Sequence, residues 1–440
     1  MTPTSLRPLG GSFAWKLTGG GTRFVAYVAV FLLSTNLLSR EQYGEAQQVL
    51  AVVAVAAAFA DFGLSGSMRR FLGQLAVKQP GVIRPFLLRT CVLATALALL
   101  GAGVMIVARE PLAGWFESPL LTALIWLAAP LTVFWVLNVL LSAVLDGLER
   151  FDLQAGTASL YAVTLGGGTA LFLLATPDAA ALVWAYLVSH VAVVLVMAVL
   201  IVWVTRGRWR AEGREVPAPL AYGGWVFLAT IGGLIMSRVN TLVIGAFHDA
   251  GEVALYSVAD RFFQIPLMGS FLLVGVIGPR ASRLEAAGDR DGLQALFRVS
   301  NGGIGLLFGA ALAVIFAATP LIVGLMFTKY LDAVPLIRVL LPLGLLRTFG
   351  GIAAGGFLIA CGHARAVAVV SAISTILVVG GDLLFVPAHG AWGAVYVSLV
   401  VQGTAAVIGV ILVTRLLRIR FGMSLRGARE LLLGRRGEPT

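Results

Sequence analysis

Runs of about twenty consecutive apolar residues recur along almost the whole chain, and they limit the folds that it can adopt. An α-helix rises 1.5 Å per residue, so each run is long enough to cross roughly 30 Å of hydrocarbon. Of the 440 residues, 59% are hydrophobic and 12% are charged, and the mean hydropathy is +0.94. Soluble domains have about 45–50% apolar and about 25% charged residues. The sequence therefore predicts an all-α polytopic membrane protein.

Charged, Pro-rich and Gly-rich breaks divide the apolar residues into about twelve predicted transmembrane helices. Their predicted limits are 13–38, 44–68, 86–107, 119–144, 155–175, 180–204, 222–247, 253–277, 299–319, 333–360, 365–386 and 391–414. The first break, in "FLLSTNLLSREQYGEAQQVL", places charged residues from Arg40 to Glu45 between two apolar runs. This pattern predicts a helical hairpin whose turn reaches water. The first run is too long for a signal peptide and contains Arg23, so it is predicted to be the first spanning helix.

The distribution of Lys and Arg predicts the orientation in the membrane, because basic residues favour cytoplasmic loops. With the N-terminus inside, the inner loops and helix edges collect 24 basic residues, whereas the outer loops hold three basic and eight acidic residues. Both termini are thus expected to be cytoplasmic, in a cell inner membrane. The net charge of +11 then reflects topology and contact with anionic membrane lipids. Nucleic acid is not an expected partner.

A polar connection, "TRGRWRAEGREVPAPLAYGG", lies near the middle of the chain and divides it into two halves of six helices. The predicted organisation is an N-terminal lobe (1–205), a cytoplasmic linker (206–221), a C-terminal lobe (222–414) and a basic cytoplasmic tail (415–440). "EQYGEAQQVLAVV" and "GEVALYSVADRFF" are weakly alike and each follows a short acidic turn. An even number of helices per half indicates a repeat with a pseudo-two-fold axis along the membrane normal.

The sequence contains few residues of the types and spacings that are typical of catalytic or metal sites. The two cysteines, Cys91 and Cys361, and the four scattered histidines have neither disulfide nor metal-ligand spacing. The Gly-rich pieces "LTGGGT" and "TLGGGTA" lack the Lys-Ser/Thr of a phosphate-binding loop, and close helix packing explains them better. We therefore expect no catalytic residue, no metal and no cofactor, and a protein that is not an enzyme.

Ionisable residues inside the predicted spans are the main functional signal, because each one costs roughly 2.5–3.5 kcal/mol at a helix centre. Leaving aside those within three positions of a span limit, there are eight Asp and Arg residues: Arg23, Asp61, Arg238, Asp260, Arg261, Arg338, Arg347 and Asp382. Arg338 and Asp382 lie near the predicted outer ends, where they could reach the interface. The others lie deeper and must face protein or water. Interhelical salt bridges, such as Asp61 with an arginine, are the structural alternative to a functional role.

Arginine outnumbers aspartate among these residues, so a cavity lined by them would attract an anion. A guanidinium group offers a planar fork that matches phosphate and keeps its charge when it is desolvated. Tyr27, one turn after Arg23, and Asn240, close to Arg238, could add hydrogen bonds. Asp260 and Arg261 are adjacent, hence about 100° apart on a helix, and cannot both point into one narrow cavity.

Several stretches resemble Wzx-type polysaccharide or O-antigen repeat-unit flippases, within the superfamily of lipid II flippases and multidrug and toxin extrusion transporters. They are "LLSREQYGEAQQVLAVV", "DFGLSGSMRRFLGQLA", "GEVALYSVADRFFQIP", "VIGPRASRLEAAGDRDGLQALF", "LIVGLMFTKYLDAVPLIRVLLPL", "GFLIACGHARAVAVVSAIS" and "HGAWGAVYVSLVVQ". These helix-entrance patterns cover most of the chain in the expected order. Lipid II flippases are similar but typically have about two more helices.

The resemblance implies two six-helix lobes around a central cavity that opens alternately to each face. The implied cargo is a polyprenyl-diphosphate-linked oligosaccharide, moved from the inner to the outer leaflet. Related flippases are similar in having arginines along the cavity, a role that the resemblance gives here to Arg23, Arg238, Arg261 and Arg347. Asp61 and Asp260 are candidates either for H⁺ or Na⁺ coupling or for salt bridges.

Two other functions compete with this interpretation. A multidrug antiporter on the same scaffold would need carboxylates for organic cations, and similar antiporters place acids in the first and seventh helices. Those predicted helices contain Arg23 and Arg238 instead. A membrane polysaccharide polymerase or ligase would resemble its class in having a long catalytic outer loop, whereas the longest predicted outer loop has about a dozen residues.

Overall fold

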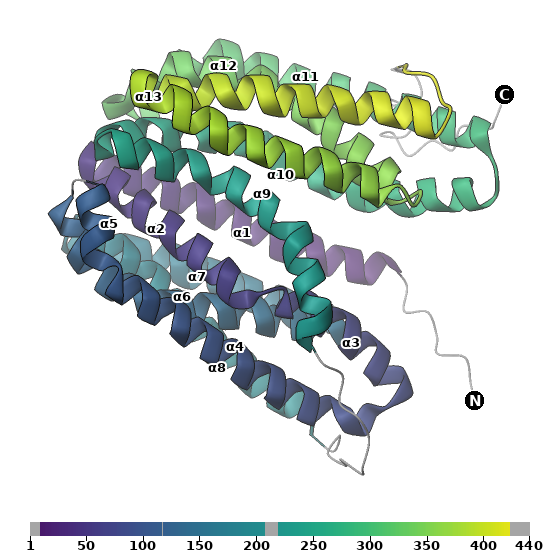
Figure 1. Ribbon diagram of the computed structural model, residues 1–440, viewed down its shortest axis with the longest axis horizontal. Coiled ribbons are helices and arrows are strands. Elements are labelled where there is room, and N and C mark those ends of the chain that lie inside the picture. The colour runs from purple at the N-terminus through teal and green to yellow at the C-terminus, as the bar shows by residue number, and fades with distance from the viewer. Residues whose placement is uncertain (1–8, 117, 207–218, 423–440) are drawn as a thin grey trace. The chain divides into compact units, whose positions relative to one another are not determined.

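Long α-helices account for nearly all of the structure, a computed structural model that describes residues 9–116, 118–206 and 219–422 (Figure 1). Within these ranges no residue is in a β-strand. Each of the twelve predicted spans overlaps a helix, and the all-α polytopic class is confirmed. Most of the predicted linker 206–221 and most of the tail 415–440 lie outside the described residues.

The helices run in chain order with short connections. Their bounds are α1 Leu9–Leu37, α2 Arg40–Asp61, α3 Leu64–Lys78, η1 Pro80–Val82, α4 Ile83–Val107, α5 Arg109–Trp115, α6 Pro119–Gly147, α7 Phe151–Ala175, α8 Ala179–Val204, α9 Pro219–Phe247, α10 Ala250–Ala286, α11 Arg290–Met326, η2 Thr328–Tyr330, α12 Ala333–Gly351, η3 Ile352–Ile359 and α13 Ala364–Leu416. The short η3 is a π-helix that continues α12.

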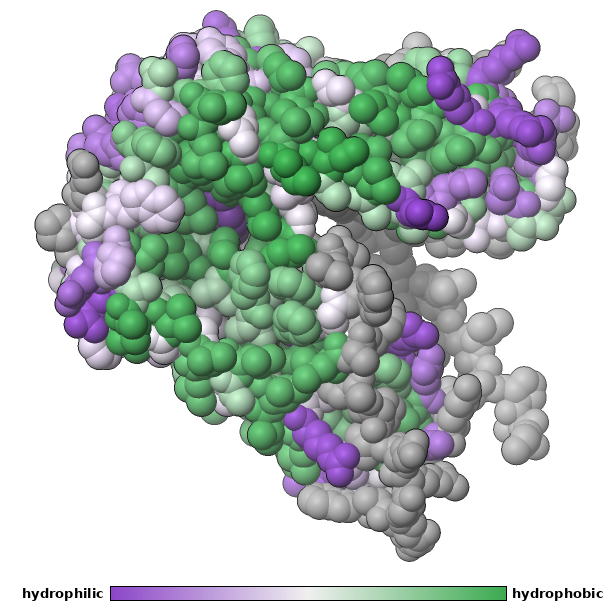
Figure 2. Space-filling model, viewed as in Figure 1, coloured by the Kyte–Doolittle hydropathy of each residue, from purple (hydrophilic) through white to green (hydrophobic). Residues whose placement is uncertain are grey.

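Hydrophobic side chains cover the flanks of these helices on the face drawn in Figure 2, and hydrophilic ones gather near helix ends. Large apolar residues such as Val107, Leu325 and Leu384 are more than 70% exposed. Among the described residues, eight helical segments are long and apolar enough to cross a membrane. Water would penalise so much exposed apolar surface, whereas lipid does not. The protein is a multi-pass membrane protein.

The turn of the predicted hairpin is confirmed at Ser39, which begins α2 with a capping box. Its hydroxyl accepts the backbone N–H of Gln42 at 3.2 Å, and the Gln42 side chain accepts the N–H of Ser39 at 3.3 Å. Two backbone donors that a helix start leaves unpaired are thereby satisfied. The first helix therefore ends at Leu37, and the polar residue Ser39 caps the start of the next one.

The predicted second span, 44–68, is wrong as a single helix. Phe62 (φ 42°) and Gly63 (φ 72°) both adopt the left-handed conformation, which ends α2 at Asp61 and starts α3 at Leu64. A Cβ atom at Gly63 would also clash with the carbonyl oxygen of Gly223. Only glycine meets both requirements without strain, so the break is set by local backbone conformation and by close packing together.

Two compact units make up the chain. The first comprises Met1–Arg238 and Asp249–Gly251, and the second comprises Val239–His248 and Glu252–Thr440. Within the first unit, α1 packs mainly on α7, α6 on α8, and α2 on α6. Within the second, α12 packs on α13 and α11. The predicted lobe limits, 1–205 and 222–414, stay a prediction.

The core of the second unit includes an aromatic pair that joins α11 to η3. The rings of Phe297 and Phe357 meet edge to face, with centroids 5.1 Å apart, and both side chains are fully buried. Ile352, Leu358 and Val413 belong to the same apolar cluster. Contacts of this kind fix the irregular π-helical turn in place.

Candidate functional site

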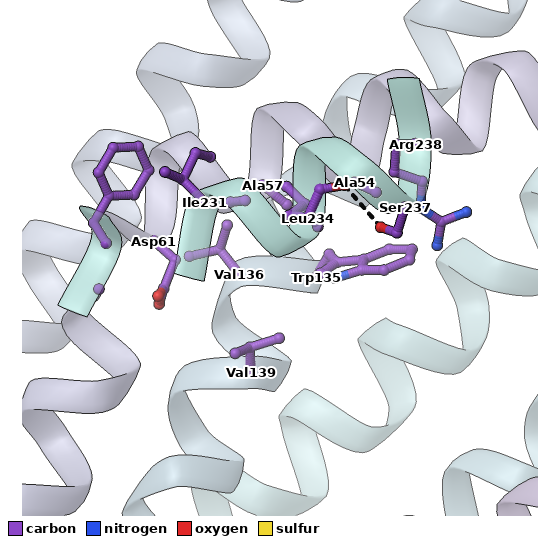
Figure 3. Close-up of a pocket in the computed structure, with 13 residues that line it drawn as sticks. Ala54, Ala57, Asp61, Trp135, Val136, Val139, Ile231, Leu234, Ser237 and Arg238 are labelled. Atoms are coloured by element: carbon purple, nitrogen blue, oxygen red, sulfur yellow. Dashed lines mark hydrogen bonds between the residues drawn. The ribbon is translucent and has the colours of Figure 1, made fainter. Parts of the chain in front are cut away.

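A cavity of about 380 Å³ opens within the first unit, between α2, α6 and the first part of α9 (Figure 3). Its lining is mostly aliphatic, with Trp135 as its largest side chain. Three polar residues also line it, and two of these, Asp61 and Arg238, were predicted from the sequence as site residues. The structure thus brings an acidic and a basic residue, 177 positions apart, to one cavity.

Three alanines of α2 make room for the cavity. Ala54, Ala57 and Ala58 have the i, i+3, i+4 spacing that places residues on one helix face. In membrane helices such a small-residue face commonly lets two backbones approach closely. Here it borders open space instead, so the small side chains leave room for the cavity.

Close packing at the α2–α3 break holds the first part of α9 against this cavity. The rings of Phe62 and Phe227 stack with centroids 5.0 Å apart, and Phe59 lies 5.4 Å from the Phe227 ring. Gly223 contacts the Phe62 carbonyl so closely that a Cβ there would lie 2.9 Å from its oxygen. These contacts place the cavity wall one to three turns further along α9, where Ile231, Leu234 and Arg238 lie.

Asp61 lies at the last residue of α2, which corrects the prediction that it is deep inside a span. Its Oδ1 accepts the backbone N–H of Ser65 at 3.2 Å, and its Oδ2 accepts the Ser65 hydroxyl at 2.8 Å. These bonds satisfy a donor in the first turn of α3, where a carboxylate also interacts favourably with the helix dipole. The helix break supplies the reason for a carboxylate here.

Trp135 connects the cavity to a buried aromatic cluster that sequence reasoning missed. Behind the indole, the His190 ring stacks at a centroid distance of 5.0 Å and an interplanar angle of 17°. His190 is 4% exposed, and its Nδ1 donates to the Tyr186 carbonyl oxygen at 2.8 Å. Tyr161 meets the same imidazole edge to face at 4.9 Å. One face of Trp135 is therefore covered by a fixed histidine.

Arg23 borders this cluster from α1. Its guanidinium carbon lies 5.9 Å from the centroid of the Tyr161 ring, and Tyr27 also interacts with Tyr161. The Nε of Arg23 is buried without a hydrogen-bond partner among the described residues. A cation over an aromatic face is stabilised by the ring quadrupole. Arg23 is thus held beside the aromatic cluster and not in the wall of the cavity.

Arg347, Asp260 and Arg261 belong to the second unit. The guanidinium carbon of Arg347 lies 5.4 Å from the centroid of the Phe263 ring, and Asp260 lies close enough to attract it. Asp260 also accepts a hydrogen bond from Gln264. Arg261 follows on α10 and is half-buried, about 100° around the helix from Asp260. Asp260 and Arg347 therefore neutralise each other in part.

Asp382 is completely buried on α13, whereas its position near a predicted outer end suggested that it could reach the membrane interface. Both of its carboxylate oxygens lack a hydrogen-bond partner among the described residues. Nearby, Asn240 Nδ2 donates to the Tyr256 hydroxyl at 2.8 Å and to the Ser398 hydroxyl at 2.9 Å. The sequence distance to a helix end could not reveal this burial, because neighbouring helices cover the site.

Arg338, the other residue predicted at the interface, is half-buried and lies with its guanidinium carbon 5.3 Å from the centroid of the Phe316 ring. The two cysteines, Cys91 and Cys361, are free thiols. Within the described ranges, no group of three or more His, Cys, Asp or Glu side chains could hold a metal ion. The polar side chains that line the cavity are the carboxylate of Asp61, the hydroxyl of Ser237 and the guanidinium of Arg238.

A family model described as polysaccharide biosynthesis protein matches residues 9–285 of the chain, which is more than half of its length. The chain belongs to this family. The matched residues include α2, α6 and α9, the three helices that line the cavity. A search of the curated proteins found no match.

Solved structures of similar fold include a lipid II flippase and multidrug transporters. The lipid II flippase MurJ, in an inward closed conformation, has a TM-score of 0.72 at 14% identity, covering 96% of this chain and 90% of that chain. A multidrug resistance MATE family transporter of the MOP superfamily, inward-facing, has a TM-score of 0.71 at 16% identity, covering 92% and 94%. A MOP superfamily transporter from Pyrococcus furiosus has a TM-score of 0.60 at 14% identity, covering 92% and 94%.

At such identities these structures establish the fold of the family member and nothing about its cargo. With the family match, they confirm the predicted resemblance to the superfamily of polysaccharide and lipid II flippases and multidrug transporters. The residue roles that the resemblance implied stay predictions.

Proposed function

We propose that this protein is a flippase that moves a polyprenyl-diphosphate-linked oligosaccharide from the inner to the outer leaflet by alternating access through a cationic central cavity. The observation that carries the proposal is Arg238 in the wall of a cavity among membrane-spanning helices of a polysaccharide biosynthesis protein. The permanent positive charge of the Arg238 guanidinium would attract an anionic headgroup.

The physical barrier to such a cargo explains the chemistry of the helices. A diphosphate cannot cross hydrocarbon unaided, and its sugars would lose their hydrogen bonds to water. A polar passage between helices removes both penalties, while the prenyl tail stays in lipid. Guanidinium groups match the diphosphate oxygens in bidentate geometry and keep their charge when they are desolvated.

In this proposal Arg23, Arg238, Arg261 and Arg347 bind the headgroup in the course of transport. Arg238 borders the cavity, and Arg23 lies on an aromatic ring next to it. The hydrogen bonds of Asp61 to Ser65 and the attraction between Asp260 and Arg347 favour structural roles for both aspartates over H⁺ or Na⁺ coupling. We further propose an inner-membrane location with both termini in the cytoplasm, on the basis of the Lys and Arg asymmetry.

Deletion of the gene tests the proposal directly. The lipid-linked glycan should accumulate on the inner leaflet, where it is protected from periplasmic or extracellular modifying enzymes, and reintroduction of the gene should restore export. Complementation with Arg238→Gln should export at least about tenfold less, because a hydrogen bond to a charged group contributes about 1.5–3 kcal/mol. Normal glycan export in the deletion strain would reject the flippase.

Arg109→Gln is the matched control for loss of an arginine in the same unit. Arg109 pairs with Glu110 at 3.3 Å at the start of α5 and does not line the cavity. Its replacement should leave export unchanged. Equal losses in Arg109→Gln and Arg238→Gln, at equal protein abundance, would show that export depends on total charge and not on the cavity.

A multidrug antiporter is the competing function for this fold. Its organic cations would have to enter a cavity that contains Arg238 and whose carboxylate, Asp61, already accepts two hydrogen bonds. Expression in a drug-sensitive host should therefore leave resistance to cationic drugs unchanged. Increased resistance that disappears in Asp61→Asn, together with normal glycan export in the deletion strain, would establish the antiporter instead.

A further inference from the structure

The cavity of the first unit has the chemistry of a carbohydrate site, which the charges of its lining alone would not predict. We infer that it holds the sugar that is bonded directly to the diphosphate, stacked on the indole of Trp135; this rests on the proposed flippase function. The cavity is at the small end of the roughly 300–1,000 Å³ typical of ligand pockets. It therefore suits one part of such a cargo and not the whole.

One basic and one acidic residue line the cavity, Arg238 and Asp61, and together they favour a neutral group beside the anion. Arg238 would repel an organic cation, and Asp61 would repel a second anionic group. The two residues lie at different ends of the cavity, with Trp135 between them (Figure 3). A ligand whose anionic group lies at the Arg238 end and whose neutral polar ring lies toward Asp61 is attracted by the first residue and not repelled by the second. A sugar diphosphate has this order of groups.

Trp135 supplies the platform for that ring. Pyranose rings present a C–H face, which packs on an aromatic face, and a rim of hydroxyl groups, which needs hydrogen bonds. Because His190 covers one face of the indole, the part of Trp135 that lines the cavity is held in a single orientation. A fixed aromatic ring binds with little loss of conformational entropy.

The polar groups around the platform can satisfy the hydroxyl rim. A carboxylate has about four acceptor positions; Asp61 uses two of them for Ser65, and the Gly63 backbone also interacts with it. The Ser237 hydroxyl donates to the Leu234 carbonyl at 2.7 Å and still has lone pairs to accept a sugar hydroxyl. The face formed by Ala54, Ala57 and Ala58 leaves the space opposite these groups open. One end of the cavity thus offers acceptors, and the other carries the positive charge of Arg238.

Binding to the purified full-length protein in lipid nanodiscs tests the inference with two natural probes. One is the lipid-linked glycan extracted from the deletion strain, and the other is polyprenyl diphosphate without sugar. The wild type should bind the glycosylated lipid about tenfold more tightly than the bare one, because stacking and hydroxyl contacts add to headgroup binding. Trp135→Ala should remove this preference and leave the affinity for the bare lipid unchanged.

Three further variants guard against a folding artefact. Trp135→Phe keeps an aromatic face and should retain most of the preference. Ala58→Leu fills the cavity from α2 while Trp135 itself stays in the sequence, and it should abolish the preference as Trp135→Ala does. Trp184→Ala removes a 46% exposed tryptophan of α8 that does not line the cavity, and should change neither affinity.

Several results would overturn the inference while leaving the flippase intact. The first is that the wild type binds both lipids with equal affinity. The second is that Trp135→Ala loses affinity for both lipids equally, which would assign the cavity to the prenyl tail. The third is that tetraphenylphosphonium displaces the glycosylated lipid. Failure of the wild type to bind either lipid, combined with normal export in the deletion strain, would instead reject the flippase itself.

Discussion

At the scale of single residues, Cys361 gives the clearest pH-dependent expectation. It lies between η3 and α13, where burial raises the pKa of its thiol from 9.0 to about 11, and the nearby Glu285 carboxylate adds to the increase. The thiolate is the reactive form, and about one thiol in a thousand is ionised at pH 8.

In a Cys91→Ala variant, Cys361 is the only cysteine left in the chain. Its alkylation by iodoacetamide should therefore be slow at pH 8 and should accelerate about tenfold for each pH unit until the pH approaches 11. Glu285→Gln should increase the rate at pH 8, because it removes a negative charge that disfavours the thiolate. Labelling at pH 8 as fast as that of a free thiol in solution would contradict this expectation.

At the scale of the secondary-structure elements, the bend of α13 depends on Gly390. This residue has φ 56° and ψ −136° inside an otherwise helical segment, and the N–H of Ala391 donates to Glu252 Oε2 at 3.1 Å where the helix resumes. Gly390→Ala should lower the free energy of unfolding by about 1–3 kcal/mol, because this conformation is strained for residues with a Cβ. A thermal unfolding series in detergent measures the loss.

Gly380→Ala is the control on the same element. A Cβ atom at Gly380 would meet no neighbouring side chain or other helix within 4 Å, and the backbone there is helical, so this substitution should be neutral or stabilise by up to about 1 kcal/mol. If Gly390→Ala were as stable as Gly380→Ala, the bend would be set by packing of neighbouring helices and not by the glycine.

The break between α2 and α3 makes a second prediction for an element. Asp61→Ala removes both acceptors of Ser65 and should destabilise the protein by about 1 kcal/mol. Asp61→Asn keeps one amide oxygen for the Ser65 N–H and should retain most of the stability. If Asp61→Asn were as unstable as Asp61→Ala, the negative charge, and not the hydrogen bond to the Ser65 N–H, would stabilise the break.

At the scale of the whole molecule, the proposed cargo predicts how transport responds to membrane potential. An anion that leaves a compartment with a negative interior gains about 2.3 kcal/mol per charge per 100 mV. In proteoliposomes with a valinomycin-induced potential, efflux of the lipid-linked glycan should be faster when the interior is negative than when it is positive. A rate that ignored the potential and followed a Na⁺ or pH gradient would require coupling through a carboxylate.

Sequence reasoning succeeded where the physical signal is local. The turn at Ser39, the interruption of α13 near Gly390 and the helical overlap of every predicted span follow from hydrophobic run length and from the residues that end helices. The same reasoning failed at Phe62 and Gly63, because a short left-handed turn hardly interrupts an apolar run. It consequently placed Asp61 deep in a span when it ends α2.

Residue composition alone determined that the chain is helical and embedded in a membrane, because the need to satisfy every backbone group in hydrocarbon leaves helices as the form for long apolar segments. Only the tertiary structure decided that Asp382 is enclosed, that His190 supports Trp135, and that Ala54, Ala57, Trp135 and Arg238 surround one cavity. Each of these facts depends on which helices meet. A hydropathy profile shows how far a residue lies from the end of its own apolar run. Its burial and its part in binding depend instead on the other helices that pack against it.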